Sequence, residues 1–218
     1  LILVDAVSSM AGAKIEFDTW QLDVCLAGVQ KCFALPAGLT ICAVSDRARE
    51  RAAQVENHGY YFAYEHMDKR YEKGQTPATP AISLIQALNQ QMDDMLAEGL
   101  ENRWNRHKEM AAYVQGWART YFGLYSDEKY LSPTVTNIEN TRGISVADLN
   151  KELGKRGAMI SNGYGDLKEK TFRIAHMADI TVEEIKELLG WLDELIPVGS
   201  YATKEIKKLR VQPSGKNK

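Results

Sequence analysis

The sequence predicts an α/β protein, in which the end of a mostly parallel sheet with flanking helices is followed by a small α+β domain. Two observations support this prediction. Residues 1–5 form a continuous apolar run that ends in a carboxylate, Asp5, and such a run is typical of a parallel strand buried on both faces. After residue 121, short strand and helix patterns alternate, as in a small α+β domain.

The composition excludes several classes of partner. The 218 residues include 27 basic and 29 acidic side chains, a net charge of -2, without a long basic cluster. We therefore expect neither nucleic acid nor an anionic membrane as a partner. No apolar run approaches the roughly 20 residues of a membrane helix, and no signal peptide precedes the first strand. We therefore expect a cytoplasmic protein.

The three cysteines lack the spacing of metal ligands, so no metal site is predicted. They lie in apolar stretches, and we expect buried free thiols at Cys25, Cys32 and Cys42.

Two further strands are predicted, over residues 23–29 and 39–45, with Lys31 between them. A lysine at the mouth of a sheet is partly desolvated, and its neutral amine can attack a carbonyl and hold it as a Schiff base. The alternative is a surface lysine in a turn, because charged side chains are mostly exposed. Asp5 likewise falls where ligands bind in parallel sheets, or it begins a turn.

The helices of the first half are predicted from caps and periodicity. Asp46 is predicted to cap a charged helix, and residues 59–74 are predicted to be irregular. Thr79 and Pro80 are predicted to begin a helix that ends at Gly99. Its apolar face is predicted to comprise Ile82, Ile85, Leu88, Met92 and either Met95 or Leu96.

The second half begins with a helix predicted at residues 101–121. Ser145 is predicted to cap a helix, and Thr181 with Glu184 forms the capping box of the last helix. The predicted strands are residues 134–138, 158–160 and 171–177.

We therefore assign residues 1–98 to a first domain that contains the predicted sheet and residues 99–211 to a small α+β domain. Residues 212–218 are predicted to be a disordered polar tail.

Four motifs occur in the order VDAVSS, GVQKCFALPAG, QTPATPAIS and KTFRIAHMAD. Together they resemble the class V aminotransferases, which are fold type I enzymes dependent on pyridoxal 5'-phosphate, close to the alanine–glyoxylate and serine–pyruvate aminotransferases. The resemblance covers nearly the whole chain. It implies an aminotransferase that moves an amino group from a small amino acid, alanine or serine, to a small 2-oxo acid, glyoxylate or pyruvate.

The resemblance also implies roles for residues of the first two motifs. Asp5 matches the aspartate that pairs with the pyridine nitrogen and keeps it protonated, which makes the ring a better electron sink. Val7 matches the residue under one face of the ring, although it is equally suited to the core. Lys31 matches the Schiff-base lysine, which then moves the proton. Gln30 matches a neighbour of the phosphate, but Val29 replaces the family's usual serine.

Two further residues follow from the other motifs. Thr76 resembles the hydroxyl residue offered to the cofactor phosphate of a neighbouring subunit, which implies a homodimer with shared active sites. The alternative is that Thr76 only begins a turn. Arg173 matches the arginine that binds the substrate carboxylate through both oxygens. The alternative for Arg173 is an internal ion pair.

The family's phosphate-binding loop and ring-stacking aromatic residue are absent from this sequence. The resemblance therefore implies the C-terminal part of an aminotransferase, in which residues 1–98 are the C-terminal part of a large cofactor-binding domain that begins before Leu1.

Three alternatives remain. A phosphoserine aminotransferase needs a second anion site, for which His176 is a candidate. A cysteine desulfurase-like lyase needs a nucleophilic cysteine well after Lys31, but the last cysteine is Cys42. The third alternative is a non-catalytic fragment or regulatory module.

Overall fold

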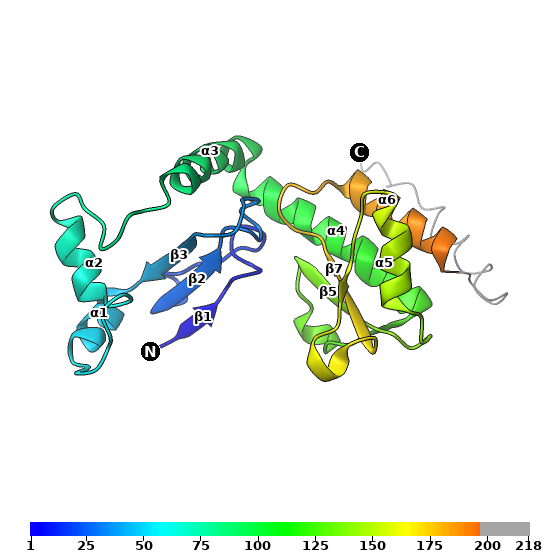
Figure 1. The fold of residues 1–218 in the computed structure, drawn as a ribbon, viewed down its shortest axis with the longest axis horizontal. Coiled ribbons are helices and arrows are strands. Elements are labelled where there is room, and N and C mark those ends of the chain that lie inside the picture. The colour runs from blue at the N-terminus through cyan, green and yellow to red at the C-terminus, as the bar shows by residue number, and fades with distance from the viewer. Residues whose placement is uncertain (197–218) are drawn as a thin grey trace, which may run out of the picture. The chain divides into compact units, whose positions relative to one another are not determined.

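The computed structural model describes residues 1–196 (Figure 1). Within it the chain divides into two compact units, which we treat separately. Unit 1 comprises Leu1–His107 with Met177–Asp179, and unit 2 comprises Lys108–His176 with the chain from Ile180 onward. The division therefore falls within one helix, α4 (Leu100–Tyr121). The predicted tail at residues 212–218 lies outside the described residues.

Unit 1 contains a mixed sheet with the strand order β1-β2-β3. Strand β1 (Leu3–Asp5) pairs in parallel with β2 (Val24–Gly28), and β2 pairs antiparallel with β3 (Thr40–Val44). The alternate residues Cys25 and Ala27 of β2 are buried, and each belongs to a small hydrophobic cluster. The predicted strands therefore form, each slightly shorter than expected.

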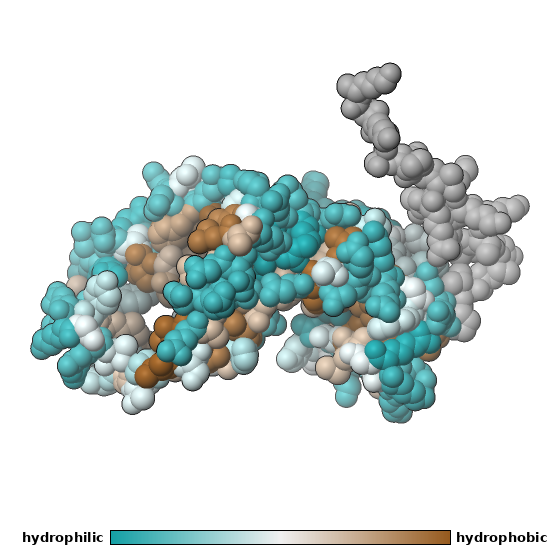
Figure 2. All heavy atoms as spheres, turned by 90° about the horizontal axis from the view of Figure 1, so that it is seen from above, coloured by the Kyte–Doolittle hydropathy of each residue, from teal (hydrophilic) through white to brown (hydrophobic). Residues whose placement is uncertain are grey.

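Strand β1 is not buried on both faces as the apolar run had predicted. It is an edge strand of the sheet, and the side chains of Leu1, Ile2 and Leu3 are 59%, 49% and 68% exposed. Val4 packs against the cluster of Ala6, Leu22 and Cys25, but the described residues leave Leu1, Ile2 and Leu3 largely exposed. Hydrophobic side chains also appear as brown patches on the space-filling surface in Figure 2.

The helices of unit 1 differ from the predictions at their starts. Helix α1 (Asp46–Ala53) is capped by Ser45, whose Oγ accepts from the Ala48 N–H, so Asp46 is its first residue and not its cap. The segment predicted to be irregular contains α2 (Tyr64–Tyr71). Short exposed helices of this kind give little apolar periodicity, and α2 buries none of its residues.

Helix α3 (Ile82–Glu98) ends at Gly99 as predicted, but Ala81 precedes it in place of the Thr79 and Pro80 start. Of its predicted apolar face only Met95 is buried. Ile82, Ile85, Met92 and Leu96 are between 44% and 65% exposed. The periodicity correctly indicated a helix, whereas burial of its face requires surface that the described residues do not supply.

Unit 2 contains an antiparallel sheet with the strand order β4-β5-β7-β6. Its strands are β4 (Gly123–Leu124), β5 (Val135–Glu139), β6 (Ser161–Asn162) and β7 (Thr171–Ala175). Residues 158–160, predicted as a strand, precede β6. Two 3-10 turns are present at Glu128–Tyr130 and Gly165–Leu167.

Two helices and the second half of α4 pack their apolar sides into one core with this sheet. Helix α5 (Val146–Gly154) is capped by Ser145, and α6 (Val182–Leu195) begins with the capping box of Thr181 and Glu184, both as predicted. The core includes Val114, Ile138, Leu153, Phe172, Ile185 and Leu192. One face of the β5-β7 pair is therefore buried, which leaves the opposite face for polar side chains.

Among the described residues, no helix combines the length and the apolar character that crossing a membrane requires.

Candidate active site

The parallel pairing of β1 with β2 determines where the first two predicted site residues lie. Asp5 pairs in register with Leu26, so both strands run toward the same edge of the sheet. Asp5 is the last residue of β1, and Lys31 follows the end of β2 by three residues. Ligands of such sheets bind beyond the carboxyl ends of parallel strands. Asp5 and Lys31 are therefore placed at the same edge.

Lys31 lies at the junction of two consecutive turns. Its N–H donates to the Gly28 carbonyl over 3.2 Å, and its own carbonyl accepts from the Ala34 N–H over 3.0 Å. The side chain is partly buried, and no acidic residue of the described chain forms an ion pair with it. The backbone of Lys31 is thus held by two turns, and its amine forms no ion pair with a described residue.

Asp5 is exposed, and one of its carboxylate oxygens accepts from the Val7 N–H over 2.9 Å. Its other oxygen has no hydrogen-bond partner among the described residues. The segment after Asp5 is also tied to the segment after Lys31, because the Cys32 thiol donates to the Ser8 carbonyl over 3.2 Å. This hydrogen bond therefore links the segment that follows Asp5, which contains Val7, to the turn of Lys31.

Gln30 and Thr76 are not joined to these residues by hydrogen bonds. Gln30 is exposed and folds back over Gly28, where an added Cβ would lie 2.6 Å from its Oε1. Thr76 is exposed, and its hydroxyl donates to the Ala78 carbonyl over 2.7 Å. The phosphate contacts predicted for both side chains remain predictions.

Arg173 lies on β7 in unit 2, on the face opposite the buried Phe172 and Ile174. Its Nη2 donates to the Asn162 carbonyl over 3.2 Å, and its guanidinium carbon lies 4.9 Å from the Tyr164 ring centroid. Its Nε is buried without a partner, and no carboxylate of the described residues pairs with it. A partly buried guanidinium without an anion is suited to binding a carboxylate.

The neighbours of Arg173 on the sheet are polar. Asn137 on β5 and Ser161 on β6 are its register partners, so the three side chains lie in a row on one face. The Asn137 Oδ1 is also buried without a partner. Arg173 and Ser161 line a pocket of about 370 Å³, together with Leu188 and Trp191.

Gly163 shapes the loop that carries the two residues contacting Arg173. A Cβ at this position would lie 2.0 Å from the Leu167 carbonyl oxygen, which no relaxed backbone allows. Only glycine therefore permits the close turn between Asn162 and Tyr164.

Comparison with known proteins identifies the family. The model of the class V aminotransferases matches residues 1–188. The chain belongs to the class V aminotransferase family. The members of this family are pyridoxal-phosphate-dependent enzymes of fold type I, so the predicted family, fold class and cofactor are confirmed.

The class V relatives include enzymes with several substrates. The chain is 34% identical to an uncharacterized aminotransferase of Methanocaldococcus jannaschii, covering 94% of this chain and 54% of that protein. It is 32% identical to the serine–glyoxylate aminotransferase of Hyphomicrobium methylovorum, covering 94% and 49%. The chain thus spans about half the length of the curated relatives it matches.

A solved structure of a phosphoserine aminotransferase from Cytophaga hutchinsonii superposes with a TM-score of 0.81. The two chains are 30% identical, over 90% of this chain and 55% of that one. The aspartate aminotransferase of Thermus thermophilus superposes with a TM-score of 0.78 at 29% identity, over 89% and 55%.

The residues present fit the cofactor of this family. The free oxygen of Asp5 can accept a hydrogen bond from a protonated ring nitrogen, and the unpaired amine of Lys31 is available to an aldehyde. Asp5 ends β1 and Lys31 follows β2, so both groups lie at the carboxyl edge of these strands, where the phosphorylated ligand of an α/β sheet is expected.

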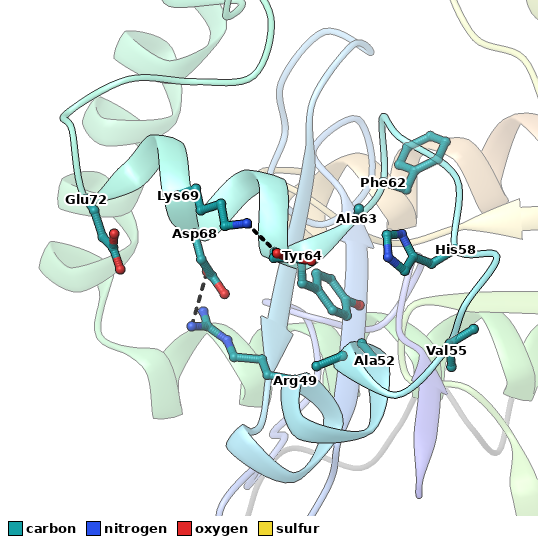
Figure 3. A pocket seen from close by; sticks show the side chains of 12 residues that line it. Arg49, Ala52, Val55, His58, Phe62, Ala63, Tyr64, Asp68, Lys69 and Glu72 are labelled. Atoms are coloured by element: carbon teal, nitrogen blue, oxygen red, sulfur yellow. Dashed lines mark hydrogen bonds and ion pairs between the residues drawn. The ribbon is translucent and has the colours of Figure 1, made fainter.

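A larger pocket in unit 1 has a different character. It measures about 500 Å³ and lies between α1 and α2, as Figure 3 shows. Four of its charged side chains are paired with one another, Arg49 with Asp68 over 3.2 Å and Lys69 with Glu65. None of the predicted site residues lines it. We therefore do not assign the active site there.

The cysteines and His176 bear on the alternatives. Cys25 and Cys32 are buried, and burial raises the pKa of the Cys32 thiol to about 11. Cys42 is exposed, contrary to the prediction, because it lies on an edge strand.

His176 is buried, its Nδ1 donating to the Pro133 carbonyl and its Nε2 accepting from the Thr136 hydroxyl. Both ring nitrogens are therefore in use, which removes the proposed phosphate contact of His176.

One buried residue near Lys31 was missed by the sequence analysis. Arg103, in the first turn of α4, is 1% exposed and donates to the carbonyl of Cys32. The signal was its position on the apolar stripe of that helix, which continues through His107, Met110, Val114 and Trp117. A charged residue on such a stripe predicts buried partners.

Proposed function

We propose that this protein is an aminotransferase that moves an amino group from a small amino acid, alanine or serine, to a small 2-oxo acid, glyoxylate or pyruvate. The observation that supports this most directly is the parallel β1-β2 pair, which places Asp5 and Lys31 at one edge of the sheet. The names of the relatives support it further, since they include serine–glyoxylate and alanine–glyoxylate aminotransferases.

In this proposal the cofactor is pyridoxal 5'-phosphate, which supplies an electron sink for the bond that breaks at the substrate Cα. Asp5 accepts a hydrogen bond from the ring nitrogen and keeps that nitrogen protonated. Lys31 would hold the cofactor aldehyde through its amine, and the same amine would be placed to carry the proton of the substrate Cα. Val7 contacts one face of the ring, and Gln30 contacts the phosphate.

Arg173 binds the carboxylate shared by all substrates. Its fork binds both carboxylate oxygens and fixes the orientation of the substrate Cα–H bond, which decides which bond is broken. The unpaired charge of Arg173 and the polar row of Asn137 and Ser161 beside it support this role.

We also propose a cytoplasmic homodimer with shared active sites, in which the Thr76 hydroxyl reaches the cofactor phosphate of the partner subunit. Thr76 is exposed and contacts no other site residue of its own chain, in agreement with this role. Thr76→Val should weaken cofactor binding without altering the free energy of unfolding measured without cofactor. A cofactor affinity equal to that of the unmodified protein would contradict this assignment.

A phosphoserine aminotransferase is the second candidate, because a structure of that name superposes well at 30% identity. The buried and doubly bonded His176 removes one candidate group for the substrate phosphate. A cysteine desulfurase-like lyase has no support, since no exposed cysteine follows β3 in the described residues. The similarity to a desulfurase structure, at 16% identity, concerns the fold alone.

The test is chemical labelling followed by substrate exchange. The intact protein is incubated with pyridoxal phosphate, reduced with borohydride and mapped by mass spectrometry. We expect the pyridoxyl group on Lys31, its loss in Lys31→Ala and its retention in Lys14→Ala, an exposed lysine of the same unit. Alanine and serine, but not phosphoserine, should convert the cofactor spectrum, and glyoxylate should restore it. Labelling of another lysine would refute the role of Lys31.

A further inference from the structure

The turn that carries Lys31 is held by a charged side chain from a distant part of the chain. Arg103 is 1% exposed, and its Nη2 donates over 2.7 Å to the carbonyl of Cys32, the residue directly after Lys31. The two residues are 71 positions apart in sequence but both belong to unit 1.

The remaining terminal N–H groups of Arg103 are also occupied. Nη1 donates to Glu98 over 2.7 Å and to Asp179 over 3.1 Å, and Nη2 donates to the same Asp179 oxygen over 3.1 Å. Two carboxylates thus compensate the buried charge, which lets the guanidinium remain in the interior. A planar guanidinium bonded on both arms has little freedom to rotate, so the Cys32 carbonyl is held at one place.

The backbone held by Arg103 adopts a conformation that alanine rarely adopts. Ala34, which closes the turn on the Lys31 carbonyl, has a φ of 57°, and Ala178, next to Asp179, has a φ of 70°. Such left-handed residues persist only where surrounding contacts impose them. Arg103 supplies contacts to both segments.

The side chain of Cys32 makes a second hydrogen bond that fixes this turn. The Cys32 thiol donates to the Ser8 carbonyl over 3.2 Å, in the loop that follows Asp5 and Val7. Burial keeps this thiol protonated, since its pKa is raised to about 11, so the S–H donor persists at neutral pH. Cys32 therefore connects the Lys31 turn, which is hydrogen-bonded to Arg103, with the loop that follows Asp5.

We propose that Arg103 is a positioning residue for Lys31, which fixes the turn of Lys31 through the Cys32 carbonyl and so holds the lysine amine at the cofactor edge of the sheet. This inference rests on the proposed function for the role of Lys31. Arg103 itself does not touch the reacting atoms in the proposal.

Arg106 provides a matched control on the same helix. It shares Glu98 with Arg103, over 2.7 Å, but donates to the Ala178 carbonyl and makes no described hydrogen bond to Cys32. Arg103→Met and Arg106→Met each remove one cation from the cluster. Only Arg103→Met releases the Cys32 carbonyl.

The first measurement is amide hydrogen exchange of the intact protein without cofactor. In Arg103→Met we expect exchange at residues 31–35 to accelerate by at least about tenfold, while β2 and β3 retain their protection. Arg106→Met should leave residues 31–35 within about twofold of the unmodified protein. If Arg103→Met does not fold, Arg103→Lys replaces it, since its ammonium can pair with Glu98 and Asp179 but cannot form the whole fork.

The second measurement is the pH titration of the absorbance band formed by Lys31 with pyridoxal phosphate. The midpoint of this titration should not change if Arg103 only stabilises the fold. A shifted midpoint in Arg103→Met, and an unchanged one in Arg106→Met, supports the proposal. Equal behaviour of both variants in exchange and in titration would overturn it. Failure of the proposed function is distinguishable, because the label would then lie on a lysine other than Lys31 in the unmodified protein.

Discussion

The two units of this chain hold their folds by different means. Unit 2 buries one continuous hydrophobic core, which includes Ile138, Leu153 and Phe172. Unit 1 has two small clusters and leaves large hydrophobic side chains exposed, among them Leu3 at 68% and Leu96 at 65%. Unit 2 is therefore stabilised mainly by its hydrophobic core, whereas unit 1 relies more on polar contacts and leaves apolar side chains exposed within the described residues.

The candidate site residues of the two units are also held in place by different kinds of contact. Lys31 stands on a turn of unit 1, and the turn is fixed by the hydrogen bonds of Arg103 and Cys32. Arg173 stands in the middle of a strand of unit 2, whose register with β5 and β6 positions it. Changes to polar contacts should therefore affect the Lys31 region most, and changes to the core should affect unit 2 most.

The largest effect is expected from Phe172→Ala in unit 2. Phe172 is fully buried and packs edge to face against Phe122, with ring centroids 5.2 Å apart. Removing the ring should lower the free energy of unfolding by about 3–5 kcal/mol. Phe62→Ala in unit 1, where the ring is 79% exposed, should change it by less than about 0.5 kcal/mol. Urea denaturation of both variants measures the difference, and equal costs would contradict the comparison.

Arg173→Lys should have the next largest effect, on catalysis and not on folding. The variant keeps the charge but loses the fork, so KM should rise for donor and acceptor and kcat should fall. Together the loss in kcat/KM should amount to roughly 2–4 kcal/mol. Arg142→Lys, an exposed arginine of the same unit, is the control and should leave kcat/KM unchanged. If Arg173→Lys instead stripped the cofactor, the carboxylate site would lie elsewhere.

The pH dependence of stability reports on the hydrogen bonds of Asp23 in unit 1. Its buried carboxylate accepts from Arg47, from the Ser45 hydroxyl and from the Ile2 N–H. The Arg47 hydrogen bond is the main cause that holds the pKa of Asp23 well below its usual range. The ionised form is therefore favoured in the folded state, and its stabilising effect is full above about pH 4, the unfolded value.

As the pH falls below about 4, the unfolded chain takes up this proton first and unit 1 loses stability. Asp23→Asn should lower stability at pH 7 and weaken the further loss on acidification. Urea midpoints at pH 7, 4 and 3 provide the measurement. An unchanged acid dependence in Asp23→Asn would show that other carboxylates dominate.

The smallest effect on folding is expected from Leu3→Lys at the edge of β1. Leu3 is exposed, so the free energy of unfolding should change by less than about 0.5 kcal/mol. The exposed apolar strand edge should nevertheless make this chain aggregate or bind cofactor weakly when it is expressed by itself. The charge at Leu3 should reduce that aggregation, measured by light scattering. Tight, stoichiometric cofactor binding by the isolated chain would contradict this expectation.

The sequence by itself determined the features that depend on neighbouring residues. The cap at Ser145, the capping box of Thr181 and Glu184, and the helix end at Gly99 were all predicted correctly, because each is formed within a few residues of the chain. The family was also identified from the sequence, because each of the four motifs is a short run of neighbouring residues and their order can be read along the chain. The start of α3 was missed, and α2 was missed because a short exposed helix that buries none of its residues gives little apolar periodicity.

Only the tertiary structure decided which predicted residues meet and what holds them. The parallel register of β1 with β2 places Asp5 and Lys31 at one edge, although 26 positions separate them in the printed sequence. The hydrogen bond from Arg103 to Cys32 spans 71 positions, and its ion pair with Asp179 spans 76. No local pattern encodes such contacts, because burial of a charge is favourable only where distant partners compensate it.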